Sequence, residues 1–258
     1  MGAVTMTPSF AIPRFNGVGR LYGPQGLKRL STSHVCVIGL GGVGSWVAEV
    51  VARSGVGAVT LVDLDEVCIS NTNRQLCALS GTVGRPKAEV LKERVLSINP
   101  DCAVTSVQQF VTKANARQLL CSGTIDPPSL EDLVADSAGE ASIYHGNQQI
   151  SCCQGGSDER ETQMKSSIFD FVVDGIDGVD DKASLIAACV DLKVPVITSG
   201  GAGGLTDPTA LRTCDMLECE DDRLMKKVRK KMRQAYGFPK GTPGNLASAQ
   251  VRALRNQL

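Results

Sequence analysis

The stretch from residue 34 to residue 75 constrains the fold more than any other part of the sequence. It opens with the apolar run Val35 to Ile38, which predicts a buried parallel strand. A glycine-rich turn follows, and apolar residues then recur at helical spacing as far as Gly55, where a helix C-cap would lie. A second apolar run, Ala58 to Val62, leads to Asp63. A strand, a glycine turn, a helix and a strand ending in an acid predict a nucleotide site.

The glycine turn and the acid suit different parts of a nucleotide. The turn contains Gly39, Gly41, Gly42 and Gly44. Glycines let the backbone approach a phosphate closely, and the start of the helix offers free N–H groups and the positive end of a dipole. Asp63 lies about 20 positions beyond the turn, where an acid can bind the ribose hydroxyls.

The polar residues that follow Asp63 indicate which kind of nucleotide is bound. They are Asp65 and the cluster Ser70 to Gln75, which includes Asn71, Asn73 and Arg74. An arginine and amides in this place suit a polyphosphate that reacts more than a pyrophosphate bridge that is only held. A nicotinamide dehydrogenase is therefore a weaker alternative.

Lys87 is a second candidate for phosphate binding. Gly84-Arg85-Pro86-Lys87 opens an expected helix that runs through Ser97. The helix dipole disfavours a cation in the first turn, so a nearby phosphate would explain a lysine there.

A further acidic site is expected after the apolar run of residues 168–173. This run predicts a strand, and it leads into Asp174-Gly175-Ile176-Asp177-Gly178. Parallel strands place functional residues at their carboxyl ends, so Asp174 and Asp177 are expected to face one cleft. The alternative is that Asp177 or Asp180 only caps the helix expected over 182–192.

Two later segments are also candidates for function. The strand Val194 to Thr198 is followed by a second glycine run, 200–204, which either approaches a ligand or forms a flexible loop. Residues 212–236 are acidic and then strongly basic, as suits one helix, with Leu224, Val228, Met232 and Ala235 as its apolar stripe. The bases form either an RNA-binding surface or a solvated face.

Composition limits the other classes of site and location. The 258 residues carry no formal net charge, and no apolar run approaches the length of a membrane span. Met1 to Pro13 lacks the features of a signal peptide, so we expect a cytoplasmic protein, with association with mitochondria as an alternative. The 10 cysteines are scattered rather than paired as Cys-x-x-Cys, and only 2 histidines are present, which favours reduced thiols over a zinc site.

These motifs resemble those of the ubiquitin-activating-enzyme superfamily and its bacterial relatives of the ThiF, MoeB and HesA types, which adenylate carboxylates. Within it the chain is most similar to the tRNA threonylcarbamoyladenosine dehydratases. The resemblance covers roughly positions 14–112 and 168–237. Besides the motifs above, it includes Arg14-Phe15, Arg20 to Gly23, Thr72 to Gln75, Ile98-Asn99-Pro100 and Gly200 to Gly204.

The resemblance implies ATP and Mg²⁺ as cofactors, with Asp177 as the metal ligand and Arg74, Lys87 and Asp177 as the catalytic residues. The implied nucleotide contacts are Gly39, Gly41, Gly42, Gly44, Asp63, Asp65, Asn71, Asn73, Arg74, Lys87, Asp177, Gly178 and Arg20. Arg14 is the alternative to Arg20 as the arginine of the N-terminal arm that reaches the phosphates, in many relatives those of the partner subunit. The family commonly has asparagine where this chain has Gly178, so that contact is altered here.

The implied activity is the ATP-dependent dehydration and cyclisation of threonylcarbamoyladenosine in tRNA. The implied partners are tRNA, a second copy of the chain, and a sulfur-carrier or cysteine-desulfurase type of protein. An adenylyltransferase for a ubiquitin-like or sulfur-carrier protein is one alternative, and a nucleotide-binding scaffold without turnover is another.

We expect one ATP-binding domain over residues 14–237 with an α/β, Rossmann-like fold. Helices flank its mainly parallel sheet, an N-terminal arm precedes it, and a basic C-terminal helix ends it. Residues 121–167 lose all periodicity, which predicts a largely disordered insertion. Residues 238–258 form a short tail, where relatives continue with further strands, so the completeness of the substrate pocket is in question.

Overall fold

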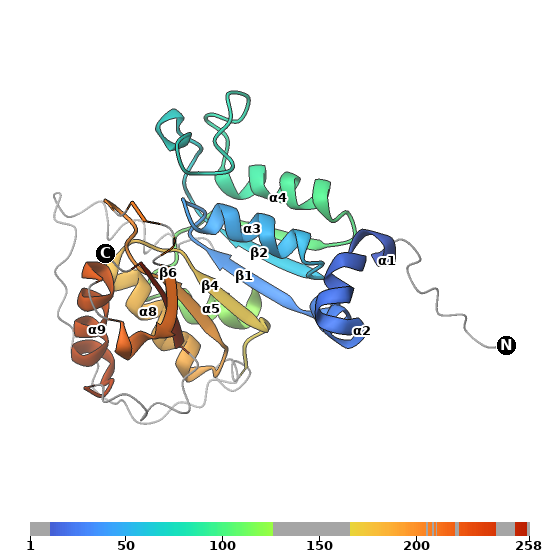
Figure 1. The fold of residues 1–258 in the computed structure, drawn as a ribbon. Helices are drawn as coiled ribbons and strands as arrows, with labels where there is room; N and C mark the ends of the chain where they lie inside the picture. Colours follow the sequence, from blue (N-terminus) through green and yellow to red (C-terminus); the bar gives the residue numbers. More distant parts are fainter. Residues whose placement is uncertain are drawn as a thin grey trace, which may run out of the picture.

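A seven-stranded sheet with the order β3-β2-β1-β4-β5-β7-β6 forms the centre of the structure, a computed structural model (Figure 1). The structure describes residues 11–125, 166–204, 206–207, 209, 211–219, 222–240 and 251–256. The strands are β1 (His34–Ile38), β2 (Ala58–Val62), β3 (Ala103–Val107), β4 (Phe171–Asp174), β5 (Val196–Ser199), β6 (Leu211–Asp215) and β7 (Val251–Asn256).

Most of the strands are parallel, which confirms the Rossmann-like fold. The strands β3, β2, β1, β4, β5 and β7 pair in parallel, and β6 pairs with β7 in the antiparallel sense. In the register, Ile38 lies beside Val62 on one side and Asp174 on the other. The segments that follow β1, β2 and β4 therefore meet at one edge of the sheet.

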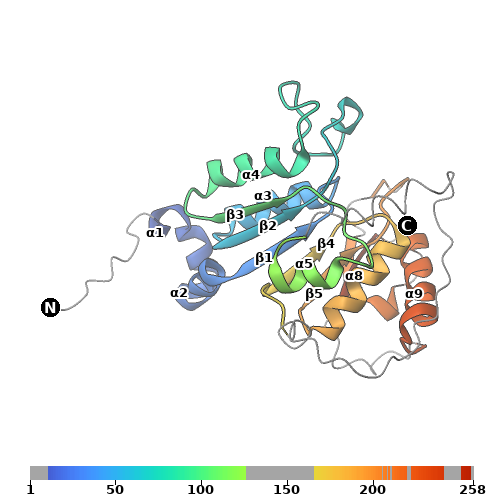
Figure 2. The ribbon, with the colours of Figure 1, turned by 180° about the vertical axis from the view of Figure 1, so that it is seen from behind.

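Apolar residues cover both faces of the sheet, as its parallel strands require. Successive residues of β1 alternate between two cores: Cys36 and Ile38 belong to one, and Val35 and Val37 to the other. The helices α5 (Ala116–Ser122), α8 (Val179–Asp191) and α9 (Arg223–Tyr236) pack in the first core. The helices α3 (Gly44–Arg53) and α4 (Lys87–Ile98) pack in the second, and Figure 2 shows the two layers from behind.

The N-terminal arm consists of α1 (Ala11–Arg14) and α2 (Asn16–Thr32), with a kink at Gly23, whose φ is 74°, before Pro24. Phe15 is buried and fixes the arm by packing against Gly55. Because α2 leads directly into β1, the arm lies beside the amino ends of β1 and β2 (Figure 1).

The single helix expected over 212–236 is wrong. Residues 211–215 form β6, a 3₁₀ turn η3 (Met216–Glu218) follows, and only 223–236 form α9. Two of the acids that suggested a helix start are caps: Asp215 accepts from the N–H of Leu217, and Asp222 accepts from the N–H of Met225. The buried stripe of α9 is Met225, Val228 and Met232, whereas Ala235 is exposed.

Two expected boundaries also differ. The insertion was expected from position 121, but Cys121 and Ser122 close α5, and residues 126–165 lie outside the described part of the chain. The expected domain end at 237 divides the sheet, because residues 251–256 form β7 between β5 and β6. The expected strands and helices nearer the centre of the sequence are present, including β2 with the predicted bounds.

No helix in the described residues is long and apolar enough to cross a membrane.

Candidate active site

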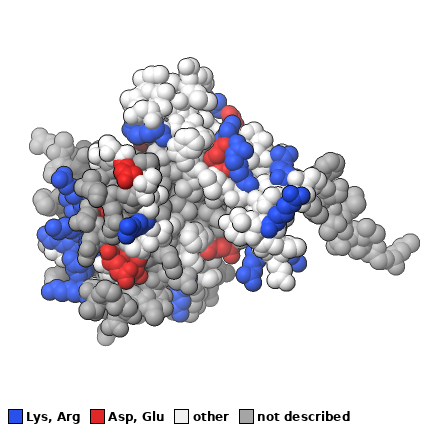
Figure 3. Space-filling view, viewed as in Figure 1, with Lys and Arg blue, Asp and Glu red and all other residues white. Residues whose placement is uncertain are grey.

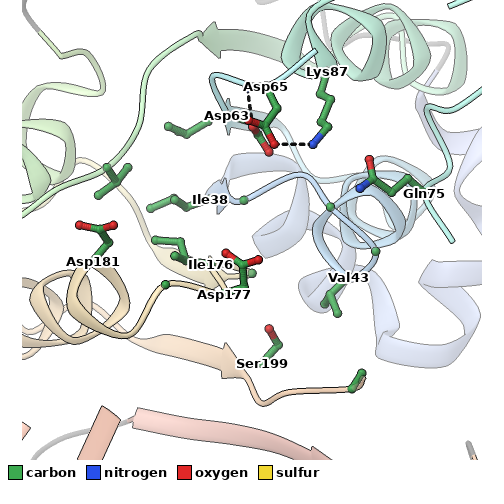
Figure 4. Close-up of a pocket in the computed structure, with 18 of the residues that line it drawn as sticks. Ile38, Val43, Asp63, Asp65, Gln75, Lys87, Ile176, Asp177, Asp181 and Ser199 are labelled. Carbon is green, nitrogen blue, oxygen red and sulfur yellow. Dashed lines mark hydrogen bonds and ion pairs between the residues drawn. The ribbon is translucent and has the colours of Figure 1, made fainter. Parts of the chain in front are cut away.

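A cavity of about 810 Å³ lies at the carboxyl edge of the parallel strands (Figure 4). The glycine turn after β1 and the segment from Asp63 to Lys87 form part of its wall. Residues 175–178 after β4 and the second glycine run after β5 line it from another side. The crossover topology thus brings together segments that are far apart in the sequence.

The glycine turn contains both lining and packing glycines. Gly39, Gly41 and Gly42 line the cavity. Within the described residues, the amides of Gly41 and Gly42 donate to no other group, so both are available to an anion. Gly44 does not line the cavity, and a Cβ there would collide with the carbonyl oxygen of Gly39. Gly44 therefore lets α3 begin close to the turn, and its nucleotide contact stays a prediction.

Asp63 is held rigidly at the end of β2. Its carboxylate accepts the N–H of Leu40 at 2.6 Å and the N–H of Asp65 at 2.8 Å, and the residue is 9% exposed. Burial raises the pKa of Asp63, while these two hydrogen bonds act in the opposite direction. Asp63 lines the cavity, so its remaining lone pairs can accept from ribose hydroxyls there.

Lys87 lines the cavity, and it has a partner that the sequence did not reveal. Its Nζ lies 2.8 Å from Oδ2 of Asp65, and its side chain is 6% exposed against 54% for Asp65. The carboxylate of Asp65 therefore offsets part of the unfavourable interaction between the positive charge of Lys87 and the dipole of α4. An ammonium group has three donors, so Lys87 can bind Asp65 and a phosphate at once.

The polar cluster beyond β2 divides between the cavity and the surface. Asn71, Arg74 and Gln75 line the cavity. Asn73 does not, but its side-chain oxygen accepts from Arg74 at 2.7 Å, so it positions the arginine. Asn71 also accepts the N–H of Cys68, which closes the 3₁₀ turn η1 (Ile69–Asn71). Gln75 was not among the predicted contacts, although it lies in the same motif.

The two acids at and just beyond the end of β4 do not face one cleft, contrary to expectation. Asp174 is fully buried and forms an ion pair with Lys182, whereas Asp177 is exposed and lines the cavity. Within the described residues Asp177 forms no hydrogen bond or ion pair. Gly178 is the N-cap of α8, without a side-chain cap, so the capping alternative for Asp177 is also wrong.

The second glycine run, a candidate from the sequence, also lines the cavity from Gly200 to Gly203. Lining residues without a sequence signal for the site are Gln109, Phe110 and Val111 after β3, Asp181 on α8, Ser199 at the end of β5, and Leu224, which was predicted only as part of the apolar stripe of α9. Burial, and to a lesser degree the charge of Asp180, raise the pKa of Asp181. Figure 4 shows Asp177, Asp181 and Ser199 across the cavity from Asp63, Asp65 and Lys87.

Comparison with known proteins gives the family. Residues 17–137 match the ThiF family. The tRNA threonylcarbamoyladenosine dehydratase of Haemophilus influenzae is 42% identical over 225 residues, which are 87% of this chain and 69% of that protein. The chain belongs to the tRNA threonylcarbamoyladenosine dehydratase family. The resemblance inferred from the motifs is thereby confirmed.

Solved structures of this dehydratase family have the same fold. The E. coli tRNA N6-threonylcarbamoyladenosine dehydratase TcdA in complex with AMP has a TM-score of 0.75 at 36% identity, covering 99% of this chain and 84% of that one. Its complex with ATP has a TM-score of 0.73 at 37% identity, covering 96% and 82%.

Neither arginine of the arm reaches the cavity of its own chain. Arg20 does not line it, and Arg14 donates to the carbonyl oxygen of Ile98 at 2.7 Å instead. The dehydratase-family expectation that Arg20 binds the phosphates stays a prediction, and it requires a second copy of the chain to supply the arginine.

Proposed function

We propose that the chain is an ATP-dependent dehydratase that cyclises threonylcarbamoyladenosine in tRNA. The observation that carries the proposal is one cavity that joins the free glycine amides, Asp63, Lys87 and Asp177, in a member of this family. These groups suit a nucleoside triphosphate, and the cavity has ample volume for a nucleotide together with a small reacting group.

The chemistry must convert a carboxylate oxygen into a leaving group. We propose that this oxygen attacks the α-phosphorus of ATP, so that a P–O bond forms and pyrophosphate leaves. A second nucleophilic atom of the same threonylcarbamoyl group then attacks the activated carbonyl carbon and loses its proton. AMP leaves with the former carboxylate oxygen, and the substrate has lost the elements of one water.

The residues of the cavity suit these steps without a side-chain nucleophile. The amides of Gly41 and Gly42, the ammonium group of Lys87 and the guanidinium group of Arg74 can stabilise negative charge that develops on the phosphates. Asp63 would hold the ribose and so fix the position of the α-phosphorus. This pre-organisation lowers the barrier because charge develops against fixed dipoles rather than against mobile water.

The cavity also fits Mg²⁺. Its charged lining residues are Asp63, Asp65, Asp177 and Asp181 against Arg74 and Lys87, so a triphosphate would meet a lining of net negative charge. A divalent cation supplies the missing positive charge and polarises the phosphate. Mg²⁺ is commonly bound by one or two carboxylates together with phosphate oxygens, and we propose as its ligand the carboxylate of Asp177, which is unpaired within the described part of the chain.

The function is tested by ATP consumption with and without tRNA that contains threonylcarbamoyladenosine. We expect ATP to yield AMP and pyrophosphate only with this tRNA, and the nucleoside to lose the mass of one water. With ¹⁸O in the substrate carboxylate, the label should appear in AMP. Turnover with the C-terminus of a carrier protein and without tRNA would instead establish an adenylyltransferase, and loss of water without label in AMP would contradict the proposed order of steps.

The helix α9 is the surface we propose for tRNA phosphates. Leu224, in its first turn, lines the cavity, so the helix starts beside the proposed site. Two cations of the helix have partners within the protein. Arg229 donates to the carbonyl oxygens of Met216 and Cys219, and Lys231 forms an ion pair with Asp180. Its other cations, such as Lys226 and Lys230, form no ion pair within the described residues. Figure 3 shows Lys and Arg side chains gathered over α9, at the left of this face.

Reversing the charges at Lys226, Lys227 and Lys230 should weaken tRNA binding by about tenfold or more at low salt, and it should reduce the slope of log K against log salt by about two. The reason is that fewer phosphates are neutralised and fewer counterions are released. Reversal of Lys28, Lys92 and Lys113 changes the net charge equally and is the control. Equal weakening in both triple variants would show that net charge, and not α9, determines binding.

We also propose a homodimer. Its support is a set of exposed apolar side chains on the arm and on α3, namely Leu21, Tyr22, Trp46 and Val50. Sedimentation equilibrium should return twice the mass of the chain, and a single-chain mass would contradict this proposal and the role of Arg20.

A tRNA substrate places the reaction in the cytoplasm or in mitochondria. A sulfur-carrier or cysteine-desulfurase partner stays a prediction, which co-purification from the native source would test.

A further inference from the structure

Three buried polar side chains lie behind the wall of the cavity that carries Asp177. Asp174 at the end of β4, Lys182 on α8 and Thr198 on β5 are each 0% exposed. Lys182 Nζ donates to Asp174 Oδ2 at 2.8 Å and to Thr198 Oγ1 at 2.9 Å, and Thr198 Oγ1 donates to Asp174 Oδ2 at 2.6 Å. None of the three lines the cavity, and none has a part in the proposed chemistry.

Stability alone is a weak explanation for this cluster. Taking an ammonium group and a carboxylate out of water carries a desolvation penalty that their mutual attraction often only balances. Apolar side chains of similar volume would fill the same space between β4, α8 and β5 without that penalty. The ion pair is therefore better explained by the segments of the chain that it holds in position.

Asp174 holds the loop that carries Asp177. Its second oxygen, Oδ1, accepts the N–H of Ile176 at 3.0 Å, while Oδ2 is bound by Lys182 and Thr198. The N–H of Gly175 donates to Ile38 at 2.7 Å. A Cβ on Gly175 would lie 2.7 Å from the carbonyl oxygen of Gly39, so this loop is in close contact with the glycine turn. The position of the carboxylate thus sets the path of the backbone on both sides of Ile176.

Thr198 connects the same carboxylate to a second loop. It is followed by Ser199, which ends β5 and opens the glycine run that lines the cavity. Figure 4 shows Ser199 and Asp177 on the same side of the cavity. One buried carboxylate therefore ties together the ends of β4 and β5 and the first half of α8.

We propose that Asp174, Lys182 and Thr198 form a positioning group that sets the loops after β4 and β5 to receive the metal-bound triphosphate. The inference rests on the proposed function, because that function makes Mg–ATP the ligand of the cavity. The group acts through the place of Asp177 and not by touching the nucleotide. Its loss should therefore weaken the binding of Mg–ATP much more than that of AMP, which lacks the two outer phosphates.

The variant that tests the group with the least disturbance is Thr198→Val, which keeps the side-chain volume and the ion pair. We expect the Kd for Mg–ATP, measured by calorimetry, to rise about tenfold and the Kd for AMP to change by no more than about twofold, as for residues that orient a metal ligand. Thr198→Ser should restore wild-type binding because it restores the hydroxyl. The control is Thr60→Val, which removes the hydroxyl of a threonine that is 1% exposed and lies 2.9 Å from Nε2 of His34.

A second variant removes both charges together. In Asp174→Asn with Lys182→Met, the amide oxygen can still accept from Ile176, and no charge is left buried without a partner. We expect this double variant to unfold in a single thermal transition, as a folded protein does, and to show the same selective loss of Mg–ATP binding. Equal loss of Mg–ATP and AMP binding in both variants, or lower thermal stability with unchanged binding of both, would overturn the proposal. If the wild type binds Mg–ATP but does not dehydrate the modified tRNA, the proposed function fails, and the binding comparison still decides the role of the group.

Discussion

Replacing Lys87 with methionine should lower kcat for ATP consumption about a hundredfold, the usual loss when one donor to a developing negative charge is removed. The ammonium group lies at the start of α4, lines the cavity and is held by Asp65. It is nearly buried, so its charge is little screened by water, and its effect on a phosphate is correspondingly large. Methionine keeps the unbranched side-chain volume and removes only the charge.

The fold should survive this change. The ion pair that is lost has a partner whose side chain is 54% exposed, and such pairs contribute about 1 kcal/mol or less to the free energy of unfolding. Lys92→Met, on the same helix but not lining the cavity, is the matched control and should retain wild-type kcat. A Lys87→Met enzyme with wild-type kcat and the same thermal midpoint would remove Lys87 from the catalytic assignment.

Replacing Asp177 with asparagine should also lower kcat about a hundredfold at a fixed, limiting Mg²⁺ concentration. Asparagine has nearly the same shape but carries no charge, so the loss would report on the metal and not on packing. Because Asp177 has no hydrogen-bond or ion-pair partner within the described residues, little stability should be lost. We further expect the Mg²⁺ concentration at half-maximal rate to rise, with partial recovery of kcat at high Mg²⁺.

Asp180→Asn provides the control for this second variant. Asp180 is close in sequence, does not line the cavity, and pairs with Lys231 at 2.5 Å with both side chains well exposed. Loss of that pair should change stability slightly and leave the Mg²⁺ dependence unchanged. An Asp177→Asn enzyme whose Mg²⁺ dependence equals that of the wild type would show that another group holds the metal.

The sequence alone was sufficient for the central nucleotide-binding unit because its signals are local. The apolar run of β1, the glycine turn, the helical spacing of α3 and the acid after β2 each depend on residues that are close neighbours in the chain. Hydrophobic periodicity and the conformational freedom of glycine act over this range. Asp63, Lys87 and Asp177 were identified in the same way, from their positions just after a strand or at the start of a helix, and the structure brings all three to one cavity.

The tertiary structure decided which of these residues face the cavity and which serve packing. Gly44 belongs to the same glycine turn as Gly41, yet only the structure shows that a Cβ at this position would collide with the carbonyl oxygen of Gly39, so that Gly44 serves packing. Asp174 and Asp177 are both aspartates, at the end of β4 and just beyond it, but Asp174 forms an ion pair with Lys182 of α8 and is buried. The pattern of acids cannot distinguish them because the distinguishing partner lies on another element.

Pairing between segments that are far apart in the chain could not be predicted from the sequence either. Residues 251–256 show no strong alternation, and they become β7 because β5 and β6 supply hydrogen-bonding partners on both sides. The sequence predicted a phosphate as the partner of Lys87, and the structure shows the carboxylate of Asp65 beside it as well. Local patterns thus determined the nucleotide-binding unit and its chemistry, whereas contacts between distant segments, which depend on how the whole chain packs, decided the partner and orientation of each charged group.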